Sequence, residues 1–317
     1  MKFRVSAVVV ALLIFVPPMF SQALPPAGNR LAMGQRAPLG PFVLNMKKEV
    51  QEVNLVLSVT DRRGHFVQGL APADLAIFDN DKLQTTLTYF QSQTDLPLRV
   101  AILLDISSSI GDRFTVEQET INAFLKRATT RRDSVELFAF NQYVQVDVPV
   151  TNNWNQLSRR VRQITPAGET AIYDALGTAS RWLAQDNTPS RRIIILISDG
   201  EENRSTATLQ DTVATVLRSE ATVYSVNMQD LPPIDTVTKE GTALLQKLAD
   251  ATGGAYLRAA DNGDVGGAFG KIRWELRSQY AIAYKPSNLA DKFFHQLRIA
   301  ASTRNLRVRC RTGYYVK

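Results

Sequence analysis

Five side chains stand out because their types and spacing suit a metal ion. Three of them form a D-x-S-x-S motif directly after an apolar run at 98–104, and the last follows a second apolar run at 193–197. Carboxylate and hydroxyl oxygens are hard ligands, which favour an octahedral cation such as Mg²⁺. The candidate ligands are Asp105, Ser107, Ser109, Thr170 and Asp199.

The apolar runs must position these side chains. The runs at 98–104 and 193–197 are nearly continuously apolar, and 221–226 is similar, which is typical of strands in a parallel sheet covered by helices on both faces. In such a sheet, ligand sites form outside the carboxyl ends of the strands. The loop with Thr170 comes just before a predicted helix, so it must surface at the same edge. We therefore expect all five side chains at one edge of the sheet.

Amphipathic helices alternate with these strands. Apolar residues recur with helical spacing at 121–128, 172–183, 209–217 and 244–248, and a last helix is predicted at 265–278. Strands and helices that alternate over about 180 residues favour an α/β fold with a doubly wound, mostly parallel sheet.

Short strands with period-two alternation flank this centre. Each flank has only about 40 residues, too few to hold a core alone. We therefore expect both flanks to pack together as one small antiparallel β sandwich, with the α/β domain inserted between them. The predicted strands are 53–59, 75–78 and 83–90 before the centre, and 280–284, 293–301 and 305–316 after it.

This arrangement also predicts where the metal edge faces. Asp105 follows the carboxyl end of the first central strand, whereas the connection from the sandwich enters at the amino end of that strand. The last helix should run antiparallel to the strands and end at that same amino-end pole. Both connections to the sandwich should therefore lie at the pole opposite the metal.

The N-terminal residues have the features of a secretory signal peptide. Lys2 and Arg4 precede an apolar run at 5–16 that is short for a membrane span, and Ser21 and Ala23 are small residues suited to cleavage. The predicted product is exported, periplasmic or extracellular, and no later segment is expected to span a membrane. The predicted parts are a signal peptide (1–23), a flexible lead-in (24–48), the N-terminal part of the sandwich (49–95), the α/β domain (96–278) and the C-terminal part of the sandwich (279–317).

Charge and cysteine content narrow the classes of partner. The formal net charge is +7, and residues 271–317 alone sum to +9. Arg307, Arg309 and Arg311 alternate with apolar residues, which predicts a basic stripe on an outer face that could meet an anionic surface or simply prevent strand aggregation.

An exported chain without interleaved aromatic residues is not expected to bind nucleic acid. The single cysteine excludes an internal disulfide.

The D-x-S-x-S motif, the loop threonine and the S-D-G sequence at 198–200 resemble the von Willebrand factor A (VWA) domain with its metal-ion-dependent adhesion site, over about 96–278. The flanks resemble those of exported bacterial VWA-related proteins of the acidobacterial type. The resemblance implies that Ser107, Ser109 and Thr170 are metal ligands, and that Asp105 and Asp199 bind directly or through water. It also implies Mg²⁺, with Mn²⁺ and Ca²⁺ as alternatives, and a protein partner that offers a carboxylate to the metal.

Two other functional classes are weighed against this adhesion hypothesis. A D-x-S-x-S motif often only caps a helix, and the domain would then be a scaffold in the cell envelope whose sandwich binds the partner. An enzyme is not expected, because the chain has no G-x-x-x-x-G-K-[ST] loop and no G-x-S-x-G elbow, and its two histidines are poorly placed for a triad. The sequence therefore favours a non-enzymatic binding or adhesion protein.

Overall fold

The computed structural model describes one compact unit that begins after Lys48. The predicted signal peptide, the lead-in and the predicted helix at 121–128 lie outside the described residues. The structure describes residues 52–92, 96–110, 114, 118, 130, 132–186, 188–229, 235–258, 265–286, 293–303 and 305–316.

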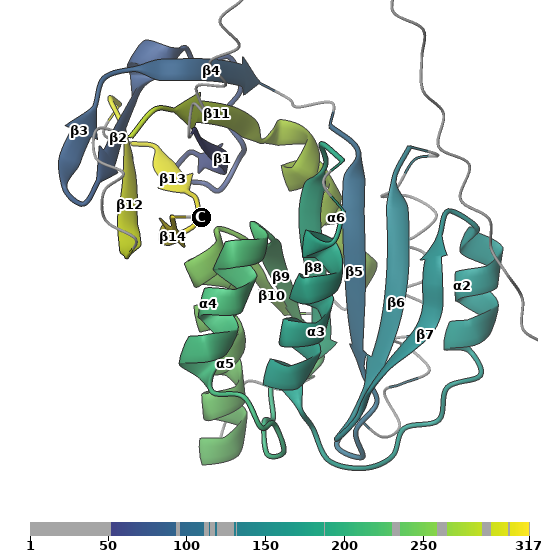
Figure 1. Ribbon diagram of the computed structural model, residues 1–317. Coiled ribbons are helices and arrows are strands. Elements are labelled where there is room, and N and C mark those ends of the chain that lie inside the picture. Colours follow the sequence, from purple (N-terminus) through teal and green to yellow (C-terminus); the bar gives the residue numbers. More distant parts are fainter. Residues whose placement is uncertain are drawn as a thin grey trace, which may run out of the picture. The chain divides into compact units, whose positions relative to one another are not determined.

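A six-stranded sheet forms the centre of the unit (Figure 1). Its strand order is β10-β9-β8-β5-β6-β7, and every neighbouring pair is parallel except β6 with β7. The predicted doubly wound, mostly parallel sheet is therefore confirmed. The strands are β5 (Leu98–Asp105), β6 (Ser134–Phe140), β7 (Val144–Thr151), β8 (Arg191–Ser198), β9 (Thr222–Asn227) and β10 (Tyr256–Arg258).

Helices cover both faces of this sheet. One apolar core contains side chains of α3, α4 and α5, and the core on the opposite face contains side chains of α2 and α6. Strand β5 contributes Ala101 and Leu103 to the first core and Ile102 and Leu104 to the second, which explains why these successive residues are all apolar. The helices are α2 (Trp154–Val161), α3 (Ile172–Ala184), α4 (Leu209–Ser219), α5 (Thr236–Thr252) and α6 (Val265–Ser278).

The two flanks build a pair of four-stranded antiparallel sheets around a shared core. The strand orders are β13-β1-β11-β4 and β14-β12-β2-β3, so each sheet takes strands from both ends of the chain. Leu57, Ile77, Tyr284 and Leu297 meet in the core between them, as the composite sandwich requires. The elements are β1 (Val53–Thr60), the 3₁₀ helix η1 (Pro72–Asp74), β2 (Leu75–Asp79), β3 (Lys82–Gln84), β4 (Leu87–Ser92), β11 (Tyr280–Tyr284), β12 (Phe294–Ala301), β13 (Arg307–Arg309) and β14 (Gly313–Tyr315).

Two predicted strands of the flanks are wrong, because each is divided between the sheets. The segment 83–90 contains β3 in one sheet and β4 in the other, and 305–316 is divided in the same way into β13 and β14. Period-two alternation reports which side chains are buried, but a strand that turns a sandwich corner keeps its buried face while it changes sheet. The turn between β2 and β3 is a tight hairpin turn: Asn80 and Asp81 both have positive φ, as such a turn requires.

The predicted outer basic stripe is also wrong for two of its three arginines. Arg309 forms an ion pair with Glu275 of α6, and Arg311 Nη2 donates to the Asn54 carbonyl at 2.9 Å. Only Arg307 is exposed. The polar side of this segment therefore meets the α/β domain at Arg309, whereas at Arg307 it faces solvent.

A buried polar network joins the sandwich to the end of α6. Glu275 Oε1 accepts hydrogen bonds from Ser58 Oγ at 2.8 Å and from the Tyr224 hydroxyl at 3.1 Å. Arg191, at the amino end of β8, donates to the Leu276 carbonyl. The sandwich therefore contacts the α/β domain at the amino ends of its central strands, as predicted, and β5 runs away from it toward Asp105 (Figure 1). In the part of the chain that the structure describes, no helix has the length and apolarity to cross a membrane.

Candidate metal centre

Three loops meet at the carboxyl edge of the central sheet. Strands β5 and β8 pair in parallel with Leu104 opposite Ile197, so Asp105 and Ser198 end the two strands side by side. The third loop precedes α3 and contains Thr170. Each of the five predicted ligand positions lies on one of these loops or at the strand end that begins it.

Asp105 is a fully buried carboxyl group. Its Oδ1 accepts a hydrogen bond from the Ser107 amide at 2.9 Å, and its Oδ2 accepts one from Ser198 Oγ at 2.6 Å. Burial raises the pKa of Asp105 to about 7, although these hydrogen bonds oppose the shift, and the Asp199 carboxylate adds a smaller increase. Among the described residues, neither Asp105 nor Asp199 forms an ion pair with a basic side chain. In the described part of the chain, no basic side chain therefore neutralises either carboxyl group.

The two motif serines present their hydroxyl groups together. Ser107 Oγ and Ser109 Oγ lie 3.0 Å apart. Ser107 is buried beside Asp105, whereas Ser109 is exposed. The two hydroxyl groups thus lie between the buried Asp105 carboxyl group and the protein surface.

Hydrogen bonds fix the Thr170 loop against both neighbouring loops. The Ser108 amide donates to the Gly168 carbonyl, and the Gly168 amide donates to Ser108 Oγ, both at 2.9 Å. On the other side, the buried Thr170 donates its amide hydrogen to Asn203 Oδ1 at 2.9 Å. The three loops are therefore held as one unit.

The loop that follows β8 needs a glycine next to Asp199. Gly200 has a φ of +87°, and a Cβ atom there would lie 2.4 Å from the Gly241 carbonyl oxygen of α5. Both the left-handed backbone and the close approach to α5 favour glycine. The glycine of the S-D-G sequence thus lets the chain turn sharply after Asp199, which is itself buried.

Several residues that organise the site were not identified from the sequence. Ser198 holds Asp105 and Asn203 holds Thr170, as described above. Glu202 accepts hydrogen bonds from Ser205 Oγ at 2.8 Å and from the Tyr173 amide at 3.1 Å. Of these three residues, only Ser198 could have been identified from the sequence, because it belongs to the S-D-G sequence. The roles of Asn203 and Glu202 depend on contacts between loops that are distant in the chain.

The donor set fits a hard divalent cation. Among the described residues there is no group of three or more His, Cys, Asp or Glu side chains that could hold a metal, so a metal here would depend on hydroxyl ligands. The edge offers three hydroxyl groups and two buried carboxyl groups, and among the described residues neither carboxyl group has a basic partner. A divalent cation would supply the missing positive charge and would bind these oxygens by preference.

Comparisons with known proteins agree with this architecture. Residues 100–202 match the family model described as von Willebrand factor type A domain. A solved von Willebrand factor type A structure from Catenulispora acidiphila is similar, with 13% identity, a TM-score of 0.51 and coverage of 76% of this chain and 73% of that chain. The solved structure of an aerotolerance-related membrane protein from Bacteroides fragilis shows 21% identity and a TM-score of 0.47. The match covers 56% of this chain and 98% of that chain. No curated protein matches the chain. Residues 100–202 of this chain therefore belong to a von Willebrand factor type A domain.

Proposed function

We propose that this protein is an exported, non-enzymatic binding protein that captures a protein partner through a divalent metal at the carboxyl edge of its VWA domain. The observation that carries the proposal is the buried Asp105 carboxyl group, which has no basic partner among the described residues, next to the Ser107 and Ser109 hydroxyls within three mutually bonded loops. VWA domains in general are interaction modules, which supports a binding role for this one.

Each predicted ligand has a role in this proposal. Ser107, Ser109 and Thr170 would provide neutral oxygen ligands, and Asp105 and Asp199 would bind directly or through water. When bound, the metal would supply an electrophilic position that accepts a carboxylate oxygen from the partner. Mg²⁺ is the ion that this donor set favours, with Mn²⁺ and Ca²⁺ as alternatives.

The charges around the site support an acidic partner group. The three hydroxyl ligands are neutral, and the two carboxyl groups together carry no more negative charge than the positive charge of a divalent cation. A metal bound there could therefore still attract one further carboxylate. On the rim, Glu169 forms an exposed ion pair with Arg204, whose Nε lies 3.3 Å from Glu169 Oε2. Glu202 accepts a hydrogen bond from Ser205 Oγ. Their charge is thus partly compensated, and the rim leaves an acidic side chain free to approach the exposed Ser109.

Chelator-sensitive capture tests this proposal. The immobilised protein is incubated with a bacterial envelope extract in the presence of Mg²⁺ or EDTA. Removing one ligand in Thr170→Ala should lower capture about tenfold to 100-fold, similar to the loss with EDTA, because metal sites lose affinity of that order when their ligands are disturbed. Thr215→Ala removes a hydroxyl on α4 that bonds only within its helix, and it should capture like wild type.

An acidic peptide should compete with the captured partner, whereas the same peptide with amidated side chains should not. If capture survives both EDTA and Thr170→Ala, the metal-bridged contact is wrong. The hypothesis that the sandwich binds the partner would then gain support.

A further inference from the structure

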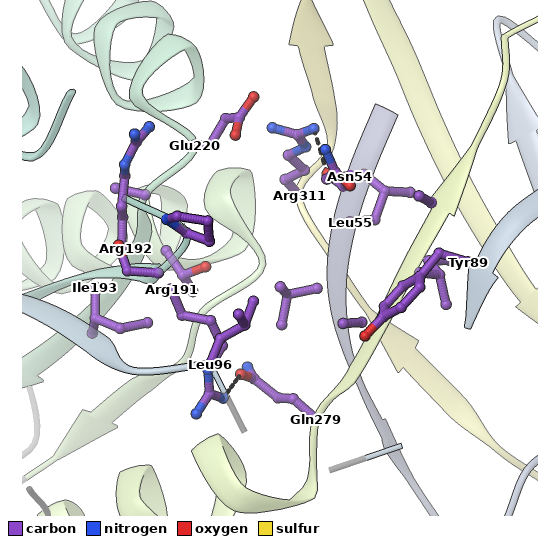
Figure 2. A pocket seen from close by; sticks show the side chains of 18 of the residues that line it. Asn54, Leu55, Tyr89, Leu96, Arg191, Arg192, Ile193, Glu220, Gln279 and Arg311 are labelled. Atoms are coloured by element: carbon purple, nitrogen blue, oxygen red, sulfur yellow. Dashed lines mark hydrogen bonds between the residues drawn. The ribbon is translucent and has the colours of Figure 1, made fainter. Parts of the chain in front are cut away.

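A cavity of about 670 Å³ lies at the junction of the sandwich and the α/β domain, at the opposite pole from Asp105 (Figure 2). The sandwich lines it with residues of β1, β4 and β11. The α/β domain lines it with the segments that begin β8 and β9. Cavities of 300–1,000 Å³ between domains, apolar with a few placed polar groups, are typical of small-molecule sites.

Small side chains on the central strand create the floor of the cavity. In β11, Tyr280, Ile282 and Tyr284 point into the sandwich core, so Ala281 and Ala283 face the cavity. The neighbouring strands carry larger groups in register: Ala283 pairs with Asn54 of β1 and with Tyr89 of β4. The alanines thus leave a groove between larger neighbours.

The other end of the cavity is basic. Arg192 donates from Nη1 to the Ser219 carbonyl at 2.9 Å and from Nη2 to the Asp186 carbonyl at 2.8 Å, both neutral acceptors. Arg311 bonds the Asn54 carbonyl. Within the described parts of the chain, neither guanidinium forms a salt bridge.

Glu220 partly offsets this positive charge. Its carboxylate faces Arg311 in Figure 2 and raises the pKa of that arginine, whereas burial, the larger influence, lowers it. Among the described residues, the charged lining groups are Arg191, Arg192 and Arg311 against Glu52 and Glu220, so their balance is positive. Apolar surface from Tyr89, Leu96 and the alanine floor completes the lining.

We propose that this cavity binds a small amphipathic anion, with its apolar body over Ala281 and Ala283 and its acidic head group near Arg192 and Arg311. Charge complementarity favours a carboxylate or sulfonate over an amine, and the volume lies within the usual range of small-molecule pockets. The site is separate from the metal centre and does not depend on the proposed function.

Fluorescence titration of the whole protein with 1-anilinonaphthalene-8-sulfonate tests the proposal, because this probe has an apolar ring system and one sulfonate. Saturable binding is expected in EDTA, and equally in Asp105→Ala. Ala283→Leu adds bulk to the floor and should weaken binding at least about tenfold. Arg192→Gln should also weaken it about tenfold or more, as for a lost charged hydrogen bond. Arg307→Gln changes an exposed arginine that does not line the cavity and should leave binding unchanged.

Competition identifies the ligand chemistry. Decanoate should displace the probe at lower concentration than decanol, and decyltrimethylammonium should be the weakest of the three. The proposal is overturned if the protein shows no saturable binding of the probe, or if the cationic competitor is the strongest of the three. It is also overturned if Ala283→Leu and Arg192→Gln bind the probe like wild type, once circular dichroism has confirmed that both variants are folded.

Discussion

Replacing Asp105 with asparagine is expected to stabilise the metal-free protein at pH 8 and to remove much of its pH dependence between pH 4 and 8. In the folded protein the Asp105 pKa is raised to about 7 from its ordinary 3.8. The unfolded chain therefore loses this proton near pH 4, whereas the folded chain keeps it until about pH 7.

The sign follows from proton linkage. Where the folded state binds more protons than the unfolded state, stability falls as the pH rises. The contribution of Asp105 is fully present below pH 4, decreases up to about pH 7 and is then constant. A difference of about three pKa units corresponds to a loss of roughly 4 kcal/mol in the free energy of unfolding. Asparagine is nearly the same size and carries no charge, so it should not show this loss.

Urea unfolding in EDTA at pH 5 and pH 8 measures the effect. The wild type should lose more stability between these values than Asp105→Asn. Asp81→Asn, which removes a carboxylate that is 87% exposed on the hairpin turn of the sandwich, should follow the wild type. Equal pH dependence of wild type and Asp105→Asn would show that the buried carboxyl group is not the source of the pH dependence.

A second large effect is expected at the junction of the two parts. Arg309→Met should lower the free energy of unfolding by about 3 to 5 kcal/mol, because it leaves the Glu275 carboxylate without its cation. The Glu275 side chain is only 4% exposed, so water cannot replace the lost partner. Burial, and after it the Glu275 charge, raise the pKa of Tyr224 well above its ordinary value, so its hydroxyl remains a donor to Glu275.

Two further variants separate the ion pair from general strand effects. Arg307→Met changes the exposed arginine of the same strand and should alter stability by less than about 0.5 kcal/mol. Adding Glu275→Gln to Arg309→Met should recover part of the loss, because the amide oxygen can still accept from Ser58 and Tyr224 without a buried charge. If Arg309→Met unfolds at the same urea concentration as Arg307→Met, the ion pair does not stabilise the junction.

The sequence predicted the fold class, the central strands β5, β8 and β9 and the loop positions of the candidate site, because these depend on local signals. A run of apolar residues such as 98–104 reports burial on both faces, and Asp105 at its end reports the carboxyl edge. The shared core of the flanks followed from their length alone. These inferences need no knowledge of which distant residues touch.

Features that depend on long-range contacts were missed or wrong. Ser198 and Asp105 are bonded across 93 positions of the chain, and no spacing rule connects them. Alternation in the last flank placed Arg309 on the polar side of its strand, but it could not show that this side faces Glu275. The edge strand β7 escaped notice because Val146 and Val150 are exposed and Pro149 interrupts its pattern.

Isothermal titration of Mg²⁺ and Mn²⁺ into the chelator-stripped protein tests the central claim most directly. We predict saturable binding of one ion per chain, lost in Asp105→Ala and Ser109→Ala and retained in Asp81→Asn. Circular dichroism of each variant establishes that the site was tested in folded protein. No saturable binding by folded wild type, or equal binding by wild type and Asp105→Ala, would contradict a metal centre at this edge of the sheet.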